Sequence, residues 1–167
     1  MKYAVIYQSK SGNTREVAEE IYKSLSTDEK VIQDIDREEE IPQADIYLVG
    51  FGIRNQMCSM DVINCFDQIT SGRFAVFATC GYVATEQYKA NLEKRLDVWM
   101  PEDADYLGMF LCQGRVSKEG QKNMLDQMPE EKERMKQLFE YGESHPDRED
   151  LEKAAQFARE IQQQVES

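Results

Sequence analysis

The sequence predicts an α/β fold built on a parallel β-sheet, on three observations. Short runs of apolar, strand-forming residues recur along the chain, and stretches with helical spacing of apolar residues separate them. Several runs are apolar throughout instead of alternating with polar residues, as in strands that are buried on both faces. Strands that alternate with helices pair in parallel through right-handed crossovers, so we expect a doubly wound, five-stranded parallel sheet with helices on both faces.

The first expected strand, at residues 2–7, ends in a polar turn that contains Gly12. A helix follows, because apolar residues at positions 17, 18, 21, 22 and 25 recur on one face. Further strands are expected at residues 30–35, 45–50, 74–79 and 106–112, and further helices around residues 62–69, 88–96 and 151–165. The acidic residues 36–40 are typical of a solvated loop.

A charged, helix-prone stretch at about residues 117–145 lies between the fifth strand and the last helix. The chain shows no internal repeat and no low-complexity linker, so we interpret this stretch as a helical insertion in one domain that spans residues 1–167. We expect the insertion to cover the sheet edge or one end of the core.

The net charge of the chain limits the classes of macromolecule that we expect as partners. Lys and Arg total 20 and Asp and Glu total 32, a formal net charge of −12. Such a chain is a poor ligand for nucleic acid and a better one for a protein with a basic docking surface. Apolar runs of membrane-spanning length and a signal-peptide core are both missing, so we expect a cytoplasmic protein that does not enter membranes.

Cysteine and histidine usage argues against a metal centre. The four cysteines form no C-x-x-C pair, and the chain has one histidine, His145. We expect reduced cysteines that are packed in the core, and a histidine at the surface or at a helix cap instead of a catalytic base. No catalytic residue and no metal ligand is predicted.

The most informative motif follows the first strand, where three hydroxyl residues, a glycine and an asparagine occur within six positions: Ser9, Lys10, Ser11, Gly12, Asn13 and Thr14. A loop of this kind presents hydroxyl and N–H groups at a helix N-terminus, whose partial positive charge attracts anions. Asn13 or Thr14 is also a candidate helix cap. We therefore predict a phosphate site here. The Walker pattern and the G-x-G-x-x-G pattern are absent, and Gln8 and Gly50 stand where a phospho-acceptor receiver domain needs acidic residues.

Three other glycine-containing loops follow predicted strands. They begin at Gly50, Thr79 and Gln113. Because ligands of a doubly wound sheet bind at the carboxyl ends of its strands, these loops should meet beside the phosphate loop. Glycines there allow a flat ligand to lie against the backbone, and Tyr82 offers a ring for stacking. Together the loops indicate a site for a phosphate joined to a planar ring.

Over roughly residues 1–114 the sequence resembles the flavodoxin family. The stretch from Tyr7 to Thr14 matches the family's T/S-x-T/S-G-x-T phosphate loop, and the order and spacing of the strands agree. The resemblance implies a flavodoxin-like sheet of strand order 2-1-3-4-5. Residues 77–82, 110–115 and 144–147 further resemble short flavodoxin-like proteins of anaerobic bacteria, some of them associated with reductase operons.

The resemblance implies noncovalent FMN as the cofactor. Its phosphate would bind the loop formed by Ser9, Lys10 (through its backbone), Ser11, Gly12, Asn13 and Thr14. Its isoalloxazine ring would lie between Gly52, Ile53 and Arg54 on one side and Cys80, Gly81 and Tyr82 on the other, with Gln113 and Gly114 closing the third side. Many relatives carry an aromatic residue in the first of these loops, where this chain has Gly50-Phe51-Gly52-Ile53. We therefore expect stacking on one side of the ring only, by Tyr82.

The function implied by the family is one-electron transfer between redox partner proteins. Two alternatives stay open. One is an FMN-dependent reductase of a small conjugated acceptor such as a quinone, with space above the ring provided by Gly52 and the 117–145 segment. The other is a flavin-free interaction module that keeps the fold.

Overall fold

The computed structural model describes residues 1–38 and 40–167. Its centre is a five-stranded parallel sheet of order β2-β1-β3-β4-β5, as the sequence predicts. The strands are β1 (Tyr3–Gln8), β2 (Lys30–Asp34), β3 (Ile46–Gly52), β4 (Arg73–Cys80) and β5 (Asp105–Gln113). Of the acidic loop expected at residues 36–40, residue 39 lies outside the described residues.

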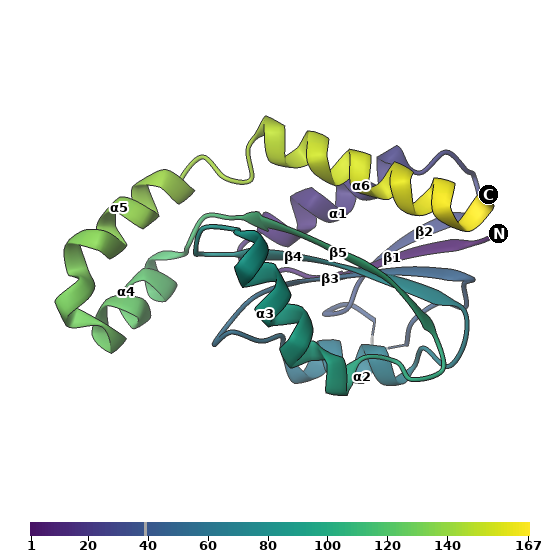
Figure 1. Ribbon diagram of the computed structural model, residues 1–167, viewed down its shortest axis with the longest axis horizontal. Helices are drawn as coiled ribbons and strands as arrows, with labels where there is room; N and C mark the ends of the chain where they lie inside the picture. Colours follow the sequence, from purple (N-terminus) through teal and green to yellow (C-terminus); the bar gives the residue numbers. More distant parts are fainter. Residues whose placement is uncertain (39) are drawn as a thin grey trace.

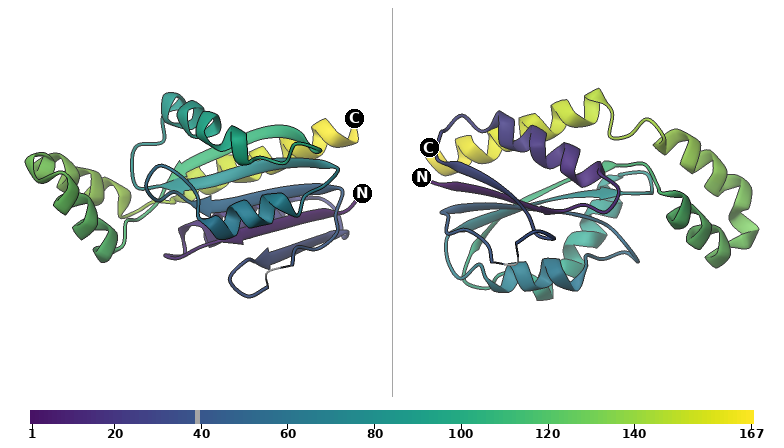
Figure 2. Two further views of the ribbon diagram at one scale, coloured as in Figure 1. Left: turned by 90° about the horizontal axis from the view of Figure 1, so that it is seen from below. Right: turned by 180° about the vertical axis from the view of Figure 1, so that it is seen from behind.

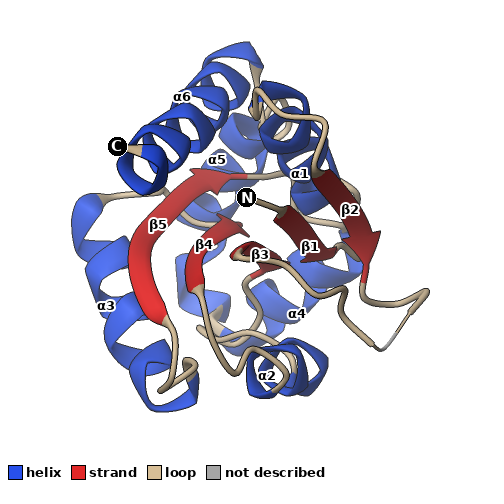
Figure 3. Ribbon diagram, turned by 90° about the vertical axis from the view of Figure 1, so that its right-hand side faces the viewer, coloured by secondary structure: helices blue, strands red, loops and turns tan. Residues whose placement is uncertain are grey.

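Helices cover both faces of the sheet (Figures 1 and 3). One face carries α1 (Asn13–Ser24) and α6 (Arg148–Glu166), and the other carries α2 (Met60–Asp67) and α3 (Glu86–Leu96), which continues into the 3₁₀ turn η1 (Asp97–Trp99). The alternation of side chains along β1 explains the two layers, since Val5 packs in the α1/α6 core and Ile6 in the α2/α3 core. Both side chains are fully buried, which is why the strand is apolar throughout.

The last helix joins distant parts of the chain. Ala154, Ala158 and Ile161 of α6 are buried in the same cluster as Val17 of α1. The hydroxyl of Tyr3 donates a hydrogen bond of 2.7 Å to Glu166 at the other end of the chain. Within the described residues, the longest helix is too polar to be a candidate for spanning a bilayer, and none of the others qualifies.

The segment between β5 and α6 forms two antiparallel helices that project from the body of the molecule (Figure 2). We call α4 (Lys118–Gln127), η2 (Pro129–Glu131) and α5 (Lys132–Gly142) the arm. The arm leaves the sheet at the carboxyl ends of the strands and extends beyond them (Figure 1). The expectation that this segment covers the sheet edge or an end of the core is therefore wrong, because α4 and α5 lie against each other beyond the sheet.

Candidate cofactor site

The polar loop after β1 turns sharply into α1. Gly12 has a φ of 93°, a left-handed conformation that glycine adopts without strain, and it is the N-cap residue of α1. Asn13 and Thr14, which the sequence offers as caps, are the first two helical residues, and both are buried. The Ser9 hydroxyl oxygen accepts hydrogen bonds from the backbone N–H groups of Gly12 (3.1 Å) and Arg15 (3.2 Å) and so fixes the shape of the loop.

This loop leaves donors for an anion. No hydrogen bond among the described residues uses the backbone N–H groups of Ser11, Asn13 or Thr14. They lie at the N-terminus of a 12-residue helix, where the helix dipole favours negative charge. The Lys10 side chain is ion-paired with Asp36 at 3.3 Å, so this residue offers the anion its backbone. The loop has the donors and the potential that a phosphate group needs.

The end of β3 lies directly beside this loop. Thr14 and Thr79 share a buried hydrogen bond of 2.9 Å between their hydroxyl groups. A Cβ atom at position 52 would lie 3.6 Å from the Thr14 hydroxyl and 3.7 Å from that of Thr79, so the exposed Gly52 sits over this pair. Thr79 is absent from the predicted site residues. The signal that points to it is a polar residue at the end of an apolar strand.

The loop after Gly52 contains a small hairpin that the sequence did not predict. Arg54 and Met57 exchange two backbone hydrogen bonds of 3.0 Å, and Asn55 and Gln56 between them have φ values of 50° and 64°. Two central residues with positive φ are typical of a type I′ turn. Ile53 is half-buried and Arg54 is exposed. Phe51 is 1% exposed in the core, so it covers nothing outside the sheet.

The end of β4 provides the second loop. The Cys80 thiol donates to the Tyr82 carbonyl oxygen at 3.1 Å, and burial raises the pKa of this thiol to about 12. Cys80 is therefore a neutral packing residue and no nucleophile at neutral pH. The Tyr82 ring leans against that of Tyr88, with centroids 6.2 Å apart, and stays partly exposed. Burial also raises the pKa of Tyr88, to about 12.

The end of β5 packs against the phosphate loop. A Cβ atom at position 114 would lie 2.5 Å from Asn13 Nδ2, so the missing side chain of Gly114 makes room for this amide. Asn13 Nδ2 donates to the Arg115 carbonyl oxygen at 2.7 Å, and the Arg115 guanidinium pairs with Glu16 at 2.9 Å. The Arg115 side chain therefore ties the end of β5 to α1.

Two buried amide atoms in this region have no partner in the described part of the chain. They are Asn13 Oδ1 and Gln113 Nε2. Asn13 is 6% exposed and Gln113 is 4% exposed. A buried polar atom without a hydrogen bond is costly, and each such atom calls for an explanation. One acceptor and one donor are thus available at the meeting point of the phosphate loop and the third loop.

A charged network lies on the β2 side of the loop. The buried Gln8 amide donates to Asp36 (2.9 Å) and to Asp61 (3.1 Å), and its oxygen accepts from the Ser59 hydroxyl at 2.5 Å. The hydrogen bond from Gln8, followed by the interaction with Lys10, holds the pKa of Asp36 below its usual value, although partial burial opposes the shift. Asp36 therefore stays ionised at neutral pH beside the phosphate loop.

The predicted site residues thus lie together at the carboxyl ends of the strands. The structure joins the phosphate loop directly to Gly52 through Thr14 and to Gly114 through Asn13. The backbone N–H of Gly114 also donates to the Cys80 carbonyl oxygen at 2.9 Å, which links the second and third loops. Ser11 and Arg54 are exposed and without a side-chain hydrogen bond in the described region.

Comparisons with known proteins agree with this arrangement. The chain matches the family described as the flavodoxin domain over residues 4–159. It is 30% identical over 168 residues to the flavodoxin-like domain-containing protein BilS of Clostridioides difficile, with 95% of each chain covered.

Two solved structures show the same fold. The oxidised Flavodoxin 2 of Bacillus cereus superposes with a TM-score of 0.63 at 20% identity, over 98% of this chain and 99% of the other. A flavoprotein of Lactobacillus acidophilus in complex with FMN superposes with a TM-score of 0.52 at 16% identity, over 66% of this chain and 92% of the other.

Proposed function

The chain belongs to the flavodoxin family, and from that membership we propose that it is an FMN-binding electron carrier that passes electrons between redox partner proteins. The family is a family of redox proteins and supports FMN as the cofactor. The transfer of electrons between partners is our proposal.

One observation carries the proposal: free donors and acceptors converge where the ligand would lie. The phosphate loop keeps three backbone N–H groups unused by the described residues, and Asn13 Oδ1 and Gln113 Nε2 are buried without a partner. The exposed Gly52 leaves room over the Thr14–Thr79 pair, and Gly114 makes room for the Asn13 amide. A ligand with a phosphate, hydroxyls and a polar ring edge matches this donor set, and FMN is such a ligand.

Different residues of the site would contact different parts of the ligand. Residues 9–14 would hold the phosphate, and Gly52 with Tyr82 would border the ring. Bound FMN supplies the redox chemistry, since flavins accept electrons one or two at a time. The protein supplies position and electrostatics. The neutral Cys80 thiol at the buried end of β4 would exclude water from its side of the bound flavin without contributing a nucleophile.

The partner proposed for this carrier is a protein with a basic docking surface. The net charge of −12 gives it a long-range attraction to such a surface. Rates of electron transfer to a basic c-type cytochrome should therefore fall as salt rises, because salt screens charges beyond about 8–10 Å. A rate that is independent of salt would contradict this part of the proposal.

A second candidate rests on Gly52. This exposed glycine leaves one side of the ring position uncovered, and Phe51 is buried in the core. An uncovered ring face suits the direct reduction of a small conjugated acceptor such as a quinone. Steady oxidation of a reduced nicotinamide by the isolated protein, with turnover of a quinone, would favour this reductase over the carrier.

The test is a titration of the purified protein with FMN, followed by stepwise anaerobic reduction under visible spectroscopy. The carrier predicts submicromolar binding and a one-electron-reduced form that persists. Direct passage to the two-electron-reduced form favours the reductase. Thr14→Val should weaken binding, because it removes a hydroxyl of the phosphate loop, whereas Thr70→Val, at an exposed position, should not. Failure to bind micromolar FMN would refute both and leave the flavin-free module.

A further inference from the structure

We call the segments that join the arm to the body of the molecule its root: residues 115–117 before α4 and residues 142–147 from the end of α5. The root contacts two of the loops that are predicted to hold the cofactor. A Cβ atom on Gly142, the last residue of α5, would lie 3.2 Å from Gln113 Nε2 and 3.3 Å from the Gly114 carbonyl oxygen. At the start of the arm, Val116 lies against Gly81, where an added Cβ would be 2.7 Å from Cγ2. The insertion is therefore built into the predicted site at both of its ends.

The same root is tied to the phosphate loop. Arg115 accepts the 2.7 Å hydrogen bond from Asn13 on its carbonyl oxygen, and its guanidinium pairs with Glu16 in the first turn of α1. Asn13 follows Gly12 at the N-terminus of that helix. A ligand that fixes Asn13 or Gln113 must therefore restrict Arg115 and Gly142 as well, because these residues are in direct contact.

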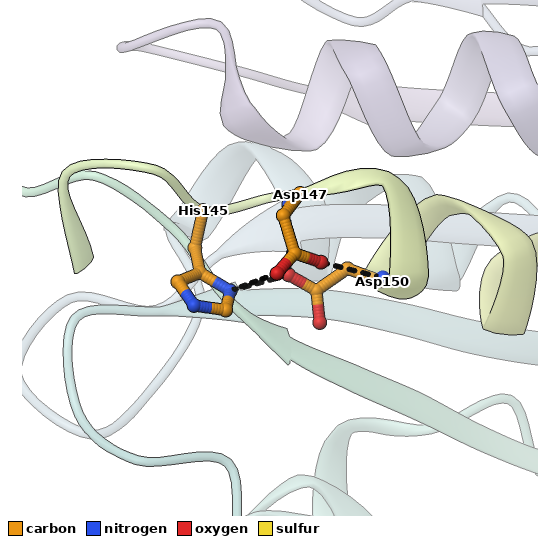
Figure 4. Close-up of side chains that lie close together, drawn as sticks. All are labelled: His145, Asp147 and Asp150. Carbon is orange, nitrogen blue, oxygen red and sulfur yellow. Dashed lines mark hydrogen bonds and ion pairs between the residues drawn. The ribbon is translucent and has the colours of Figure 1, made fainter. Parts of the chain in front are cut away.

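Contacts of His145, between α5 and α6, fix the end of α5. The side chain of His145 is 12% exposed, and its Nδ1 lies 2.6 Å from Asp150 in the capping box of α6. Of the two positions that the sequence predicts for this histidine, the surface and a helix cap, the structure shows the cap. Asp150 also accepts from the Asp147 backbone N–H at 2.9 Å, in the capping box of α6 (Figure 4). The Tyr141 ring stacks on the imidazole with ring centroids 4.8 Å apart. The backbone N–H of His145 donates to the Gly142 carbonyl oxygen at 3.0 Å.

We propose that the root of the arm, at Gly142 and His145, is a positioning element of the cofactor site: it sets Gln113 and Gly114 against the ligand, and loading the site in turn immobilises the arm. This inference rests on the proposed binding of FMN. The two effects are reciprocal by thermodynamic linkage, because a contact that favours the loaded state favours the docked root by the same factor. The arm then presents a fixed surface beside the flavin only in the loaded protein.

The first test needs no substitution. Hydrogen exchange of the full chain is measured with and without saturating FMN, at the amides of Glu143 and His145, whose hydrogen bonds to Glu140 and Gly142 close the root. We expect FMN to slow exchange there by about fivefold or more, the lower end of typical coupling between sites. Slower exchange in the phosphate loop with unchanged exchange at these two amides would overturn the inference.

The second test is Gly142→Ala. The new Cβ must push Gln113 and Gly114 aside by a few tenths of an ångström, while alanine improves the helix propensity of α5. FMN affinity should fall by about fivefold or more, and the visible absorption bands of the bound flavin should shift, without loss of thermal stability. Gln137→Ala, an exposed position on the same helix, is the matched control. Equal affinities and spectra for the two variants would refute the positioning role.

The outcomes separate the two proposals. FMN that binds tightly but leaves the root unaffected contradicts the role of the arm alone. A wild-type protein that does not bind FMN contradicts the proposed function as well. Slower exchange of the root together with weaker binding by Gly142→Ala supports both.

Discussion

Gly114 makes the most specific contact in the site, because its missing side chain accommodates a neighbouring amide. In Gly114→Ala, the new Cβ would lie 2.5 Å from Asn13 Nδ2 and 2.7 Å from its Cγ. Carbon atoms in contact are usually about 3.5–4.0 Å apart, so the amide must move by about 1 Å. That movement breaks the 2.7 Å hydrogen bond from Asn13 to the Arg115 carbonyl oxygen.

The expected cost follows from two contributions. Overfilling a packed site costs about 1–3 kcal/mol, and losing the hydrogen bond costs about 0.5–1.5 kcal/mol. Because Asn13 can partly relax, we expect a loss of about 2 kcal/mol. For a chain of this size that corresponds to a fall in Tm of roughly 4–8 °C. Urea unfolding of the apo-protein measures the loss in the free energy of unfolding.

The matched control is Gly52→Ala. Its Cβ would lie 3.6 Å from the Thr14 hydroxyl, which is ordinary contact, so the free energy of unfolding should change by less than about 0.5 kcal/mol. A double-mutant cycle then tests the cause. In an Asn13→Ala background, Gly114→Ala should lose most of its cost, since the clashing amide is gone. An equal cost in both backgrounds would refute the reasoning.

Three other substitutions test local geometry. Gly50→Ala drives its Cβ into the Phe77 ring, so we expect a loss of about 3 kcal/mol or more, seen as a large fall in Tm or as insoluble protein. Gln56→Gly relieves the positive φ of 64° in the hairpin and should stabilise the protein by up to about 1 kcal/mol in urea unfolding; a destabilised variant would contradict the assigned turn. Asp36→Asn should destabilise the protein by less than about 1 kcal/mol at neutral pH. The lowered pKa of Asp36 stabilises the fold above about pH 4 and that contribution is lost as pH falls further, so the difference between the two proteins should shrink in acid; a constant difference from pH 7 to pH 3 would contradict it.

The five strands were predictable because each is a local signal, whereas their order was implied by the resemblance to the flavodoxin family. Strands β1, β3 and β4 are buried almost throughout, whereas the outer strands β2 and β5 are only partly buried. The structure moves the predicted strand ends by at most two residues. The phosphate loop was predictable for the same reason, since residues 9–14 combine the hydroxyls, the glycine and the position that an anion site needs within six consecutive positions. Helix α1 starts where the glycine allows it.

Contacts between distant segments were not predictable. Nothing in the local sequence reveals that Gly114 accommodates Asn13, that Thr79 pairs with Thr14, or that Gly142 reaches Gln113. His145 illustrates the limit, because the sequence predicts a surface or a capping position without its partners, which are Asp150 in the capping box of α6 and the Tyr141 ring. The direction of the arm depends in the same way on long-range contacts, those of Val116 with Gly81 and of Gly142 with Gln113.

Helix α6 has a consequence for the folding of the nascent chain. It is synthesised after all five strands, yet it completes the core on the α1 face and binds Tyr3 and Ser26 near the start of the chain. Until residues 148–166 leave the ribosome, apolar side chains of β1, β3 and β5 on that face lack the cover that α6 provides. The core on the α1 face can therefore be completed only after residues 148–166 have been synthesised, and until then its apolar side chains stay open to non-native contacts.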